Sequence, residues 1–355
     1  MNAADCSDNI NRLIGQNLPF AVYRIPGGNE LHFIKGTPDS VATFDSVKML
    51  NGKSGFVIAP FRVSKSCPIA FIETDEETGI EMPDITEGSQ TTKTVYEQPS
   101  PEYVSAFEVF TRSLSDKKFD KLVLSRRTVI KRDPDFSPAT VFLKACKRYI
   151  RSYVYLCHTP QTGTWTGSTP EILLSGKRNE WHTVALAGTQ SLVNGDLPDT
   201  WDEKNREEQR LVADYIRNRL HSFRIHPKEE GPYTVRAGEL AHLRSDFRFS
   251  LPENNRLGNV LDLLHPTPAV CGLPKEKAFQ FISDNEKYDR RYYSGFIGQL
   301  NPEGKSDLYV NLRCMEIDDR CLTLYAGGGL LASSVLEEEW KETEEKLSTM
   351  QRIIH

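Results

Sequence analysis

The spacing of apolar and polar residues predicts a chain of many short strands and several helices. In the first part of the chain, apolar runs such as 19–26 and 55–61 are separated by turn residues, which is typical of short strands. The segment 83–103 is polar and contains prolines, so it predicts a linker or an exposed loop. Helical periodicity follows at 102–116, at 137–150 with Ser137 near the cap, at 203–223, and from about 337 to the end.

Strand-like runs outnumber those of a simple alternation of strands and helices. Some neighbouring runs near the C-terminal end are spaced as hairpins. This pattern favours an α+β architecture, in which sheets pack together and helices lie outside them. The apolar or alternating runs are 121–130, 153–159, 164–169, 171–176, 181–189, 292–300, 307–317 and 321–329.

The helix predicted at 203–223 turns one glutamate toward the protein interior. Its apolar residues form one stripe at about 100° per residue. On this projection Glu208 lies about 40° from the centre of the stripe, whereas Glu207 lies about 140° away and is expected at the surface. A carboxylate that faces the interior needs a cation or hydrogen-bond donors, because an unpaired buried charge costs several kcal/mol. Glu208 is therefore either the partner of an inward arginine or a metal ligand.

The C-terminal helix carries further acids beside its apolar stripe. Glu339, Glu342 and Lys346 lie within about 60° of one another on one flank of that stripe. Such acids usually belong to a solvated helix face. Carboxylates without Cys or His also suit Mg²⁺, which commonly takes one or two protein carboxylates and completes its shell with water and substrate. The other acids of this helix are expected in solvent, namely Glu338, Glu344 and Glu345.

Composition and charge exclude several classes of protein. The chain has 355 residues, of which 38% are hydrophobic and 26% charged, enough apolar material for a substantial core. The net charge is -5, whereas a nucleic-acid-binding protein usually has an excess of basic residues. No apolar run approaches the roughly 18 residues that span a membrane. The seven cysteines form no CxxC motif, and the N-terminus shows no secretory signal pattern. We therefore expect a cytoplasmic protein with thiols as core residues.

Eight short segments carry a family resemblance when they are taken together. They are KLVLSRR (121–127), GSTPEILL (167–174), ALAGT (185–189), EKNREEQRLV (203–212), HPTPAVCGLP (265–274), RRYYSGFIG (290–298), NLRCMEI (311–317) and LYAGGGLLASSVLEEEWKETEEKLSTM (324–350). In this order they resemble the chorismate-utilising enzymes, which include isochorismate, salicylate, anthranilate and aminodeoxychorismate synthases. One such motif would be weak, whereas eight collinear motifs make the resemblance specific.

The resemblance implies a fold, a metal ion and a substrate. The fold is a single large α+β domain with two stacked, mostly antiparallel β-sheets flanked by helices. In it, residues 1–99 are a variable N-terminal part and residues 100–355 are the catalytic core. The substrate is chorismate, a dicarboxylate, and the metal is Mg²⁺, with Glu208 and Glu342 as ligands and Glu339 nearby or acting through water. The implied substrate-binding residues are Gly188, Thr189, His265, Tyr293, Arg313, Gly327, Gly328 and Lys346.

These residue types suit an anionic substrate. Arg313 can bind a carboxylate through two parallel hydrogen bonds, and glycines let the backbone approach an anion closely. Without the resemblance, the glycine run that contains Gly327 would be a tight turn after a strand. Without it, His265 would be a core histidine.

The resemblance also assigns a base and an acid. Isochorismate formation adds water at carbon 2 and expels the hydroxyl at carbon 4, so it needs a base for water and an acid for the leaving group. In water-using members the base is a lysine at the position of Lys121 and the acid is a glutamate at that of Glu171. Lys121 has to be neutral, which burial or nearby cations such as Arg126 or Arg127 would favour, and the pKa of Glu171 should be raised. Taken alone, these two would be a solvated lysine and a salt-bridge partner.

The resemblance therefore favours isochorismate synthase, an isomerase. Salicylate synthase, which eliminates pyruvate afterwards, is the alternative. Anthranilate synthase component I is less favoured because ammonia-using members usually lack the lysine. Ala187 stands where aminodeoxychorismate synthases carry a lysine, and no glutamine amidotransferase subunit is expected. A third alternative is an inactive regulator that only binds chorismate. It is less favoured, because such a protein need not keep both an acid and a base. We expect a monomer, and the downstream enzyme decides whether its product serves menaquinone or siderophore biosynthesis.

Overall fold

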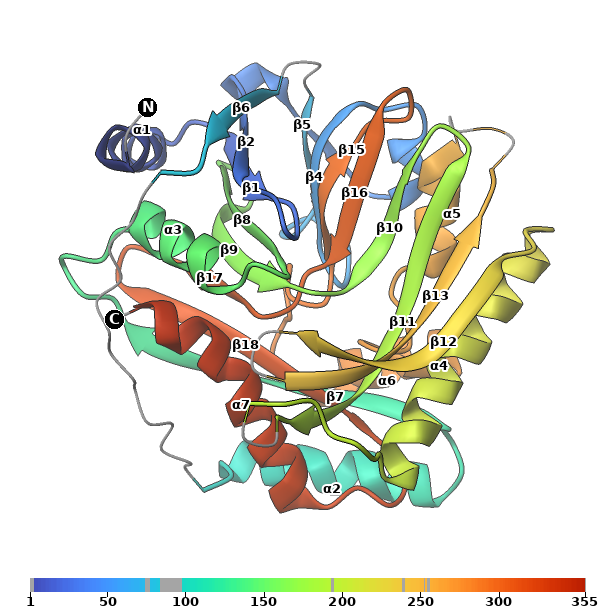
Figure 1. The fold of residues 1–355 in the computed structure, drawn as a ribbon. Helices are drawn as coiled ribbons and strands as arrows, with labels where there is room; N and C mark the ends of the chain where they lie inside the picture. Colours follow the sequence, from blue (N-terminus) through green and yellow to red (C-terminus); the bar gives the residue numbers. More distant parts are fainter. Residues whose placement is uncertain are drawn as a thin grey trace.

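The computed structural model describes residues 3–73, 77–83, 98–192, 195–237, 240–251, 253 and 256–354. Within these ranges the chain forms two nine-stranded sheets and seven α-helices (Figure 1). Neighbouring strands are antiparallel in both sheets. The α+β prediction is confirmed. The linker expected at 83–103 lies largely outside the described residues, and the part from Pro101 onward already belongs to a helix.

The first sheet contains the strand on which the predicted base lies. The strand next to it, β18 (Cys321–Leu330), carries the glycine run. Its order is β14 (Gly272–Leu273), β7 (Lys121–Lys131), β18 (Cys321–Leu330), β17 (Cys314–Ile317), β9 (Gly163–Thr169), β8 (Tyr153–Thr159), β1 (Phe20–Arg24), β2 (Glu30–Lys35) and β6 (Thr78–Glu81).

The second sheet includes two long strands, β12 and β13, which the apolar pattern does not predict. Strands from before residue 100 extend both sheets, since β1 pairs with β8 and β4 pairs with β15. The order is β12 (Lys228–Ala237), β13 (Leu240–Phe249), β11 (Glu180–Ser191), β10 (Ile172–Lys177), β16 (Lys305–Val310), β15 (Phe296–Leu300), β4 (Gly55–Ala59), β5 (Ile69–Glu73) and β3 (Val41–Phe44).

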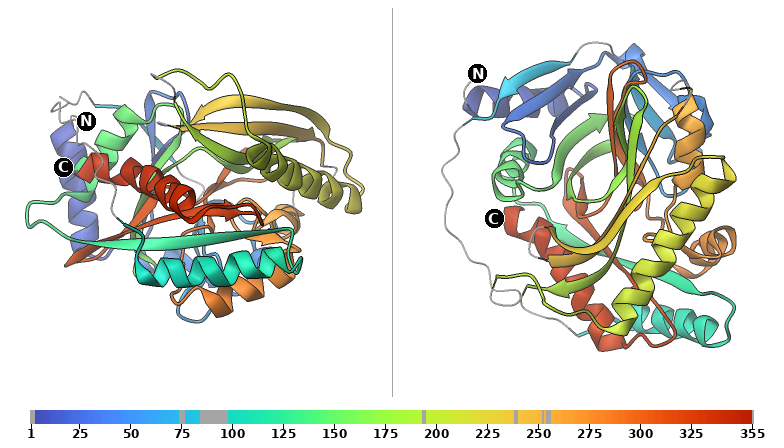
Figure 2. Two further views of the ribbon diagram at one scale, coloured as in Figure 1. Left: turned by 90° about the horizontal axis from the view of Figure 1, so that it is seen from below. Right: turned by 45° about the vertical axis from the view of Figure 1, so that its right-hand side comes forward.

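Helices cover the outer faces of the sheets, as Figure 2 shows from two directions. The helices α7 (Leu336–Ile354) and α4 (Glu203–Ser222) matter most for the site, because α7 packs along β18 and α4 packs along β11 and β13. Ser137 caps its helix as predicted, accepting a hydrogen bond from the amide of Thr140. The other helices are α1 (Ala3–Gly15), α2 (Pro101–Ser115), α3 (Pro138–Arg148), α5 (Leu257–Leu264) and α6 (Lys275–Asn285).

Two of the places at which the chain passes from one sheet to the other are neighbours in space. Pro170 and Glu171 connect β9 to β10, and residues 311–313 connect β16 to β17. The two crossings are hydrogen-bonded to each other, because Val310 N donates to Glu171 O at 2.9 Å and Ser168 N donates to Arg313 O at 3.0 Å. The run 307–317 is therefore not one strand but two, in different sheets. These crossings place Glu171 and Arg313 together in the seam between the sheets.

The interior is apolar, with a layer of aromatic rings between the sheets that includes Tyr153, Trp165 and Tyr325. The cysteines are free thiols and all but Cys321 are buried, which confirms that they are core residues. Within the described ranges, every helix is too short or too polar to cross a bilayer.

Candidate active site

One cavity collects most of the residues singled out from the sequence. It opens at the seam where both sheets meet α4 and α7. Its lining also includes His242, which was not predicted. The predicted residues in its wall are Glu171, Gly188, Thr189, Glu208, Tyr293, Arg313, Gly327 and Lys346.

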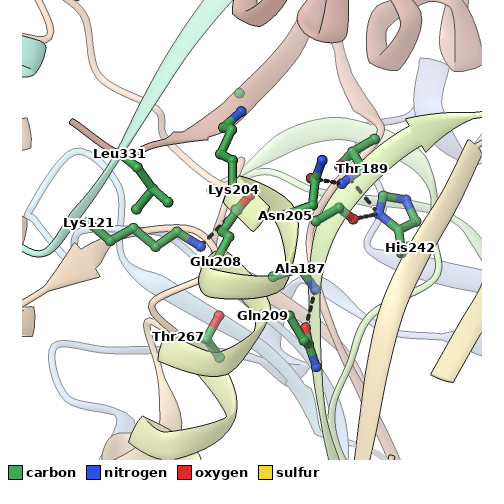
Figure 3. A network of polar contacts seen from close by, with 12 residues as sticks. Lys121, Ala187, Thr189, Lys204, Asn205, Glu208, Gln209, His242, Thr267 and Leu331 are labelled. Carbon is green, nitrogen blue, oxygen red and sulfur yellow. Dashed lines mark hydrogen bonds and ion pairs between the residues drawn. The ribbon is translucent and has the colours of Figure 1, made fainter. Parts of the chain in front are cut away.

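Lys121 and Glu208 meet at the edge of this cavity (Figure 3). Lys121 begins β7 and is completely buried, and its Nζ lies 2.8 Å from Oε1 of Glu208 on α4. Glu208 is buried, whereas Glu207 lies at the surface and pairs with Arg210, so the helix projection is confirmed. The partner of Glu208 in the interior is a lysine, and not the arginine that was considered in the sequence analysis.

Glu171 is held in a state suited to proton donation. Its side chain is almost completely buried, and burial raises its pKa to about 8, although nearby Lys121 acts in the opposite direction. Thr267 Oγ1 donates a hydrogen bond to Glu171 Oε1 at 3.4 Å. A carboxyl group with this pKa is mostly protonated at neutral pH, so Glu171 can act as a general acid.

Arg313 and His242 lie against each other in the wall of the cavity. Arg313 is buried with a backbone φ of 46°, a left-handed conformation that is uncommon for a residue with a side chain. Burial and the charge of Arg313 lower the pKa of His242 to about 3, so its ring is neutral. His242 Nδ1 lies 2.9 Å from Gly188 O, and His242 Nε2 lies 3.3 Å from Arg313 Nη2. The Nδ1–H tautomer satisfies both contacts, because Nε2 then accepts from the guanidinium.

The turn around Gly188 is fixed by side chains of α4. Gly188 has a φ of 73° and lies in a bulge of β11, where a Cβ would be 3.0 Å from Asn205 O. Asn205 Oδ1 accepts a hydrogen bond from Thr189 N at 2.8 Å, and Gln209 Oε1 accepts one from Ala187 N at 2.9 Å. The helix that carries Glu208 therefore also positions the backbone beside Arg313 and His242.

The glycine run lies in β18 and is not a tight turn. Its glycines leave room for acidic side chains that a Cβ would displace. At Gly328 a Cβ would lie 3.2 Å from Glu339 Oε2 and 3.5 Å from Glu342 Oε1, and at Gly329 it would overlap Glu208 Oε1. Three carboxylates thus approach two successive residues of one strand.

Each of these carboxylates has a lysine partner. Besides the pair of Lys121 and Glu208, Lys346 Nζ lies 2.5 Å from Glu342 Oε1 and donates to Gly327 O at 2.8 Å. Lys204 Nζ lies 2.5 Å from Glu339 Oε1. In the described part of the chain, no three His, Cys, Asp or Glu side chains are grouped closely enough to hold a metal ion as they stand.

The acids nevertheless fit Mg²⁺ chemically. Glu339 is fully buried, and its Oε2 has no hydrogen-bond partner among the described residues. Burial and neighbouring Glu342 raise the pKa of Glu339 to about 7, so its carboxylate is only weakly stabilised as it stands. Such oxygen donors are the ligands that Mg²⁺ prefers.

Some expectations about charged residues were wrong. Glu344 does not face solvent but is buried and pairs with Arg126, whose guanidinium also lies 3.7 Å from the centre of the Trp340 ring. Arg126 is therefore engaged with α7. Glu345 is only partly exposed and accepts hydrogen bonds from Ser191 Oγ.

His265 does not line the cavity. Its Nε2 lies 3.3 Å from Pro60 O and its ring packs edge-on against Phe296. Thr267, two residues later, is the member of this segment that reaches Glu171. A contact between His265 and the substrate stays a prediction.

Known proteins are similar in sequence to this chain over most of its length. The family model of chorismate binding enzymes matches residues 70–355. Isochorismate synthase EntC of Escherichia coli is 28% identical over 274 residues, which cover 74% of this chain and 70% of that protein. Isochorismate synthase DhbC of Bacillus subtilis is 27% identical over 327 residues, which cover 87% of this chain and 78% of that protein.

Solved structures show the same fold. DhbC of Bacillus anthracis superposes with a TM-score of 0.79 at 20% identity, covering 98% of this chain and 99% of that chain. The menaquinone-specific isochorismate synthase MenF of Escherichia coli superposes with a TM-score of 0.76 at 22% identity, covering 96% and 89%. Because the family model covers most of the sequence and the fold agrees, the chain belongs to the chorismate binding enzymes.

Proposed function

We propose that this protein is a Mg²⁺-dependent isochorismate synthase that adds water to carbon 2 of chorismate and expels the hydroxyl at carbon 4. The observation that carries the proposal is Glu171, a buried acid with a pKa raised to about 8, in the cavity that also holds Arg313. The names of the relatives EntC and DhbC support the same activity. A protein that only bound chorismate would have no need for such an acid.

In the proposed reaction, Lys121 accepts a proton from the attacking water, and Glu171 donates one to the departing hydroxyl. The water oxygen bonds to carbon 2, the ring double bonds shift, and the bond from carbon 4 to its hydroxyl breaks. Lys121 has to give up the proton of its ion pair with Glu208 before it can act as a base. Arg313 and Lys346 would hold the substrate carboxylates, with Tyr293 beside them.

Glu208 and Glu342 would hold the Mg²⁺ ion, with Glu339 as a direct or water-mediated ligand. Bound there, the ion would neutralise a substrate carboxylate and fix its orientation. Two observations support this placement. Glu339 Oε2 is buried and has no hydrogen-bond partner in the described part of the chain, and the three carboxylates approach Gly328 and Gly329.

Product analysis tests the proposal. The purified protein is incubated with chorismate and MgCl₂, with and without EDTA, and the products are separated and identified by mass spectrometry. We expect isochorismate with Mg²⁺ and no turnover with EDTA. Salicylate and pyruvate would instead identify a salicylate synthase, and anthranilate formed with ammonium would contradict water as the nucleophile.

The protonation of Glu171 predicts a pH effect on stability. Between its ordinary pKa of about 4.5 and its folded pKa of about 8, the folded protein keeps a proton that the unfolded chain has lost. Wild-type stability should therefore fall relative to Glu171→Gln as pH rises through this window, by on the order of 1 to 5 kcal/mol. Urea unfolding at pH 5, 7 and 9 measures the difference in the free energy of unfolding.

The exposed Glu338→Gln variant is the matched control for that series and should follow the wild type at each pH. A constant difference between Glu171→Gln and wild type from pH 5 to pH 9 would show that Glu171 is already ionised at neutral pH. In that case it would not be the general acid.

A further inference from the structure

We propose that Lys204 is an internal cation that competes with the divalent metal for the carboxylates of the site, so that its ammonium group has to leave when the metal binds. The inference rests on the metal site of the proposed function, and it concerns a residue that the proposed reaction does not use. It makes the metal affinity of the site adjustable by a group outside the substrate cavity.

Lys204 lies where a cation can reach the acids of both helices. It stands on α4 four residues before Glu208, which places the two side chains on one helix face. Its Nζ crosses to α7 and lies 2.5 Å from Glu339 Oε1. Figure 3 shows Lys204 beside Glu208 at the end of α4, with Lys121 approaching Glu208 separately. Lys204 does not line the cavity, so its partner is the acid cluster and not the substrate space.

The charges of the acid cluster are balanced by lysines. Three carboxylates face three ammonium groups at 2.8 Å, 2.5 Å and 2.5 Å. A divalent ion would therefore add two positive charges to a neutral group unless a lysine withdrew. The pairs are Lys121 with Glu208, Lys204 with Glu339, and Lys346 with Glu342.

Of these lysines, Lys204 is the one that can withdraw at least cost. The side chain of Lys121 is 0% exposed, so its ammonium group cannot turn out to bulk solvent, and the proposed reaction requires it where it lies. Lys346 also donates to Gly327 O and would be required by the substrate. The side chain of Lys204 is 20% exposed, and its flexible stem allows the ammonium group to turn toward solvent. Its departure would free Glu339 Oε1 beside Oε2, which already has no hydrogen-bond partner among the described residues.

A purely structural role for Lys204 predicts the opposite effect on metal binding. If the ammonium group only oriented Glu339, its removal would loosen a metal ligand and weaken binding. If it competes, its removal leaves a buried carboxylate without a counter-charge, and the metal then supplies that charge. The sign of the change in metal affinity separates the two roles.

The test is a titration of the full chain with Mn²⁺ in the absence of chorismate. The electron paramagnetic resonance signal of the free ion gives the dissociation constant of the bound ion. Lys204→Met should bind Mn²⁺ about 5 to 50 times more tightly than wild type, the range expected when a partly buried charge partner is removed. Lys204→Arg keeps the charge and should bind with wild-type affinity. Lys341→Met removes an exposed lysine of α7, whose Nζ is 4.0 Å from Glu345, and is the matched control.

Equal or weaker Mn²⁺ binding by Lys204→Met would overturn the inference. If wild type binds Mn²⁺ and produces isochorismate but Lys204→Met shows no tighter binding, the proposed function stands and only the competition is wrong. If neither protein binds the ion, the metal site itself is wrong. Thermal unfolding of each variant checks that the fold is retained, and Lys204→Gln replaces the Met variant if that one is unstable.

Discussion

Lys121→Ala should turn over chorismate about 10²- to 10⁴-fold more slowly than wild type and still bind it. The buried amine is the proposed base for the attacking water. Among the described residues, Lys346 is the one lysine in the wall of the cavity, and it is paired with Glu342. The substrate contacts expected from Arg313 are untouched by this change. Steady-state kinetics measure the rate, and isothermal titration with chorismate measures binding.

Two further variants make this result interpretable. Lys121→Arg keeps a positive charge opposite Glu208 but cannot give up its proton, so it should retain the fold and lose turnover. Lys131→Ala removes an exposed lysine at the other end of β7 and should behave as wild type. Full activity in Lys121→Ala or in Lys121→Arg would show that another group activates the water.

Glu342→Gln should lower activity and raise the Mg²⁺ concentration needed for half-maximal rate by about 10- to 100-fold. The amide keeps the shape of the side chain but removes the charge that a divalent ion requires. It also releases Lys346, whose Nζ lies 2.5 Å from Glu342 Oε1. Initial rates across a Mg²⁺ series at saturating chorismate give the two quantities separately.

Glu338→Gln is the matched control, because Glu338 lies on the same helix, α7, but is exposed. It should leave the Mg²⁺ dependence unchanged. If Glu342→Gln needed no more Mg²⁺ than wild type, Glu342 would not be a ligand of the ion. An equal effect in both variants would point to the general charge of the helix and not to one ligand.

Helix periodicity was sufficient to separate Glu208 from Glu207. Both acids stand in one run, yet one is buried against Lys121 and the other pairs with Arg210 at the surface. The projection worked because α4 has one apolar stripe and packs on β11 and β13. The prediction that Glu344 faces solvent was wrong, because Arg126 on β7 lies against a second face of α7 and holds that acid in the interior. A single helix cannot reveal a partner that comes from a distant strand.

His242 was missed for a related reason. It is a single histidine in a strand, and the atoms it contacts belong to Gly188 and Arg313, 54 and 71 residues away. Its position becomes meaningful only when the crossing at residues 311–313 is known. Lys204 did leave a signal in the sequence, since its spacing of four residues from Glu208 places both on one face. The sequence pattern thus indicated the acids and Lys346, which lies on the same helix as Glu342. The pairing of Lys121 with Glu208 and of Lys204 with Glu339 required the tertiary structure.

The most direct test of the proposed mechanism is to run the reaction of chorismate with Mg²⁺ in H₂¹⁸O and to analyse the product by mass spectrometry. If Lys121 activates water for attack at carbon 2 while Glu171 helps the carbon 4 hydroxyl to leave, each isochorismate molecule should carry one ¹⁸O, on carbon 2. The label should disappear together with turnover in Lys121→Ala. Unlabelled isochorismate, or a product other than isochorismate, would contradict the account.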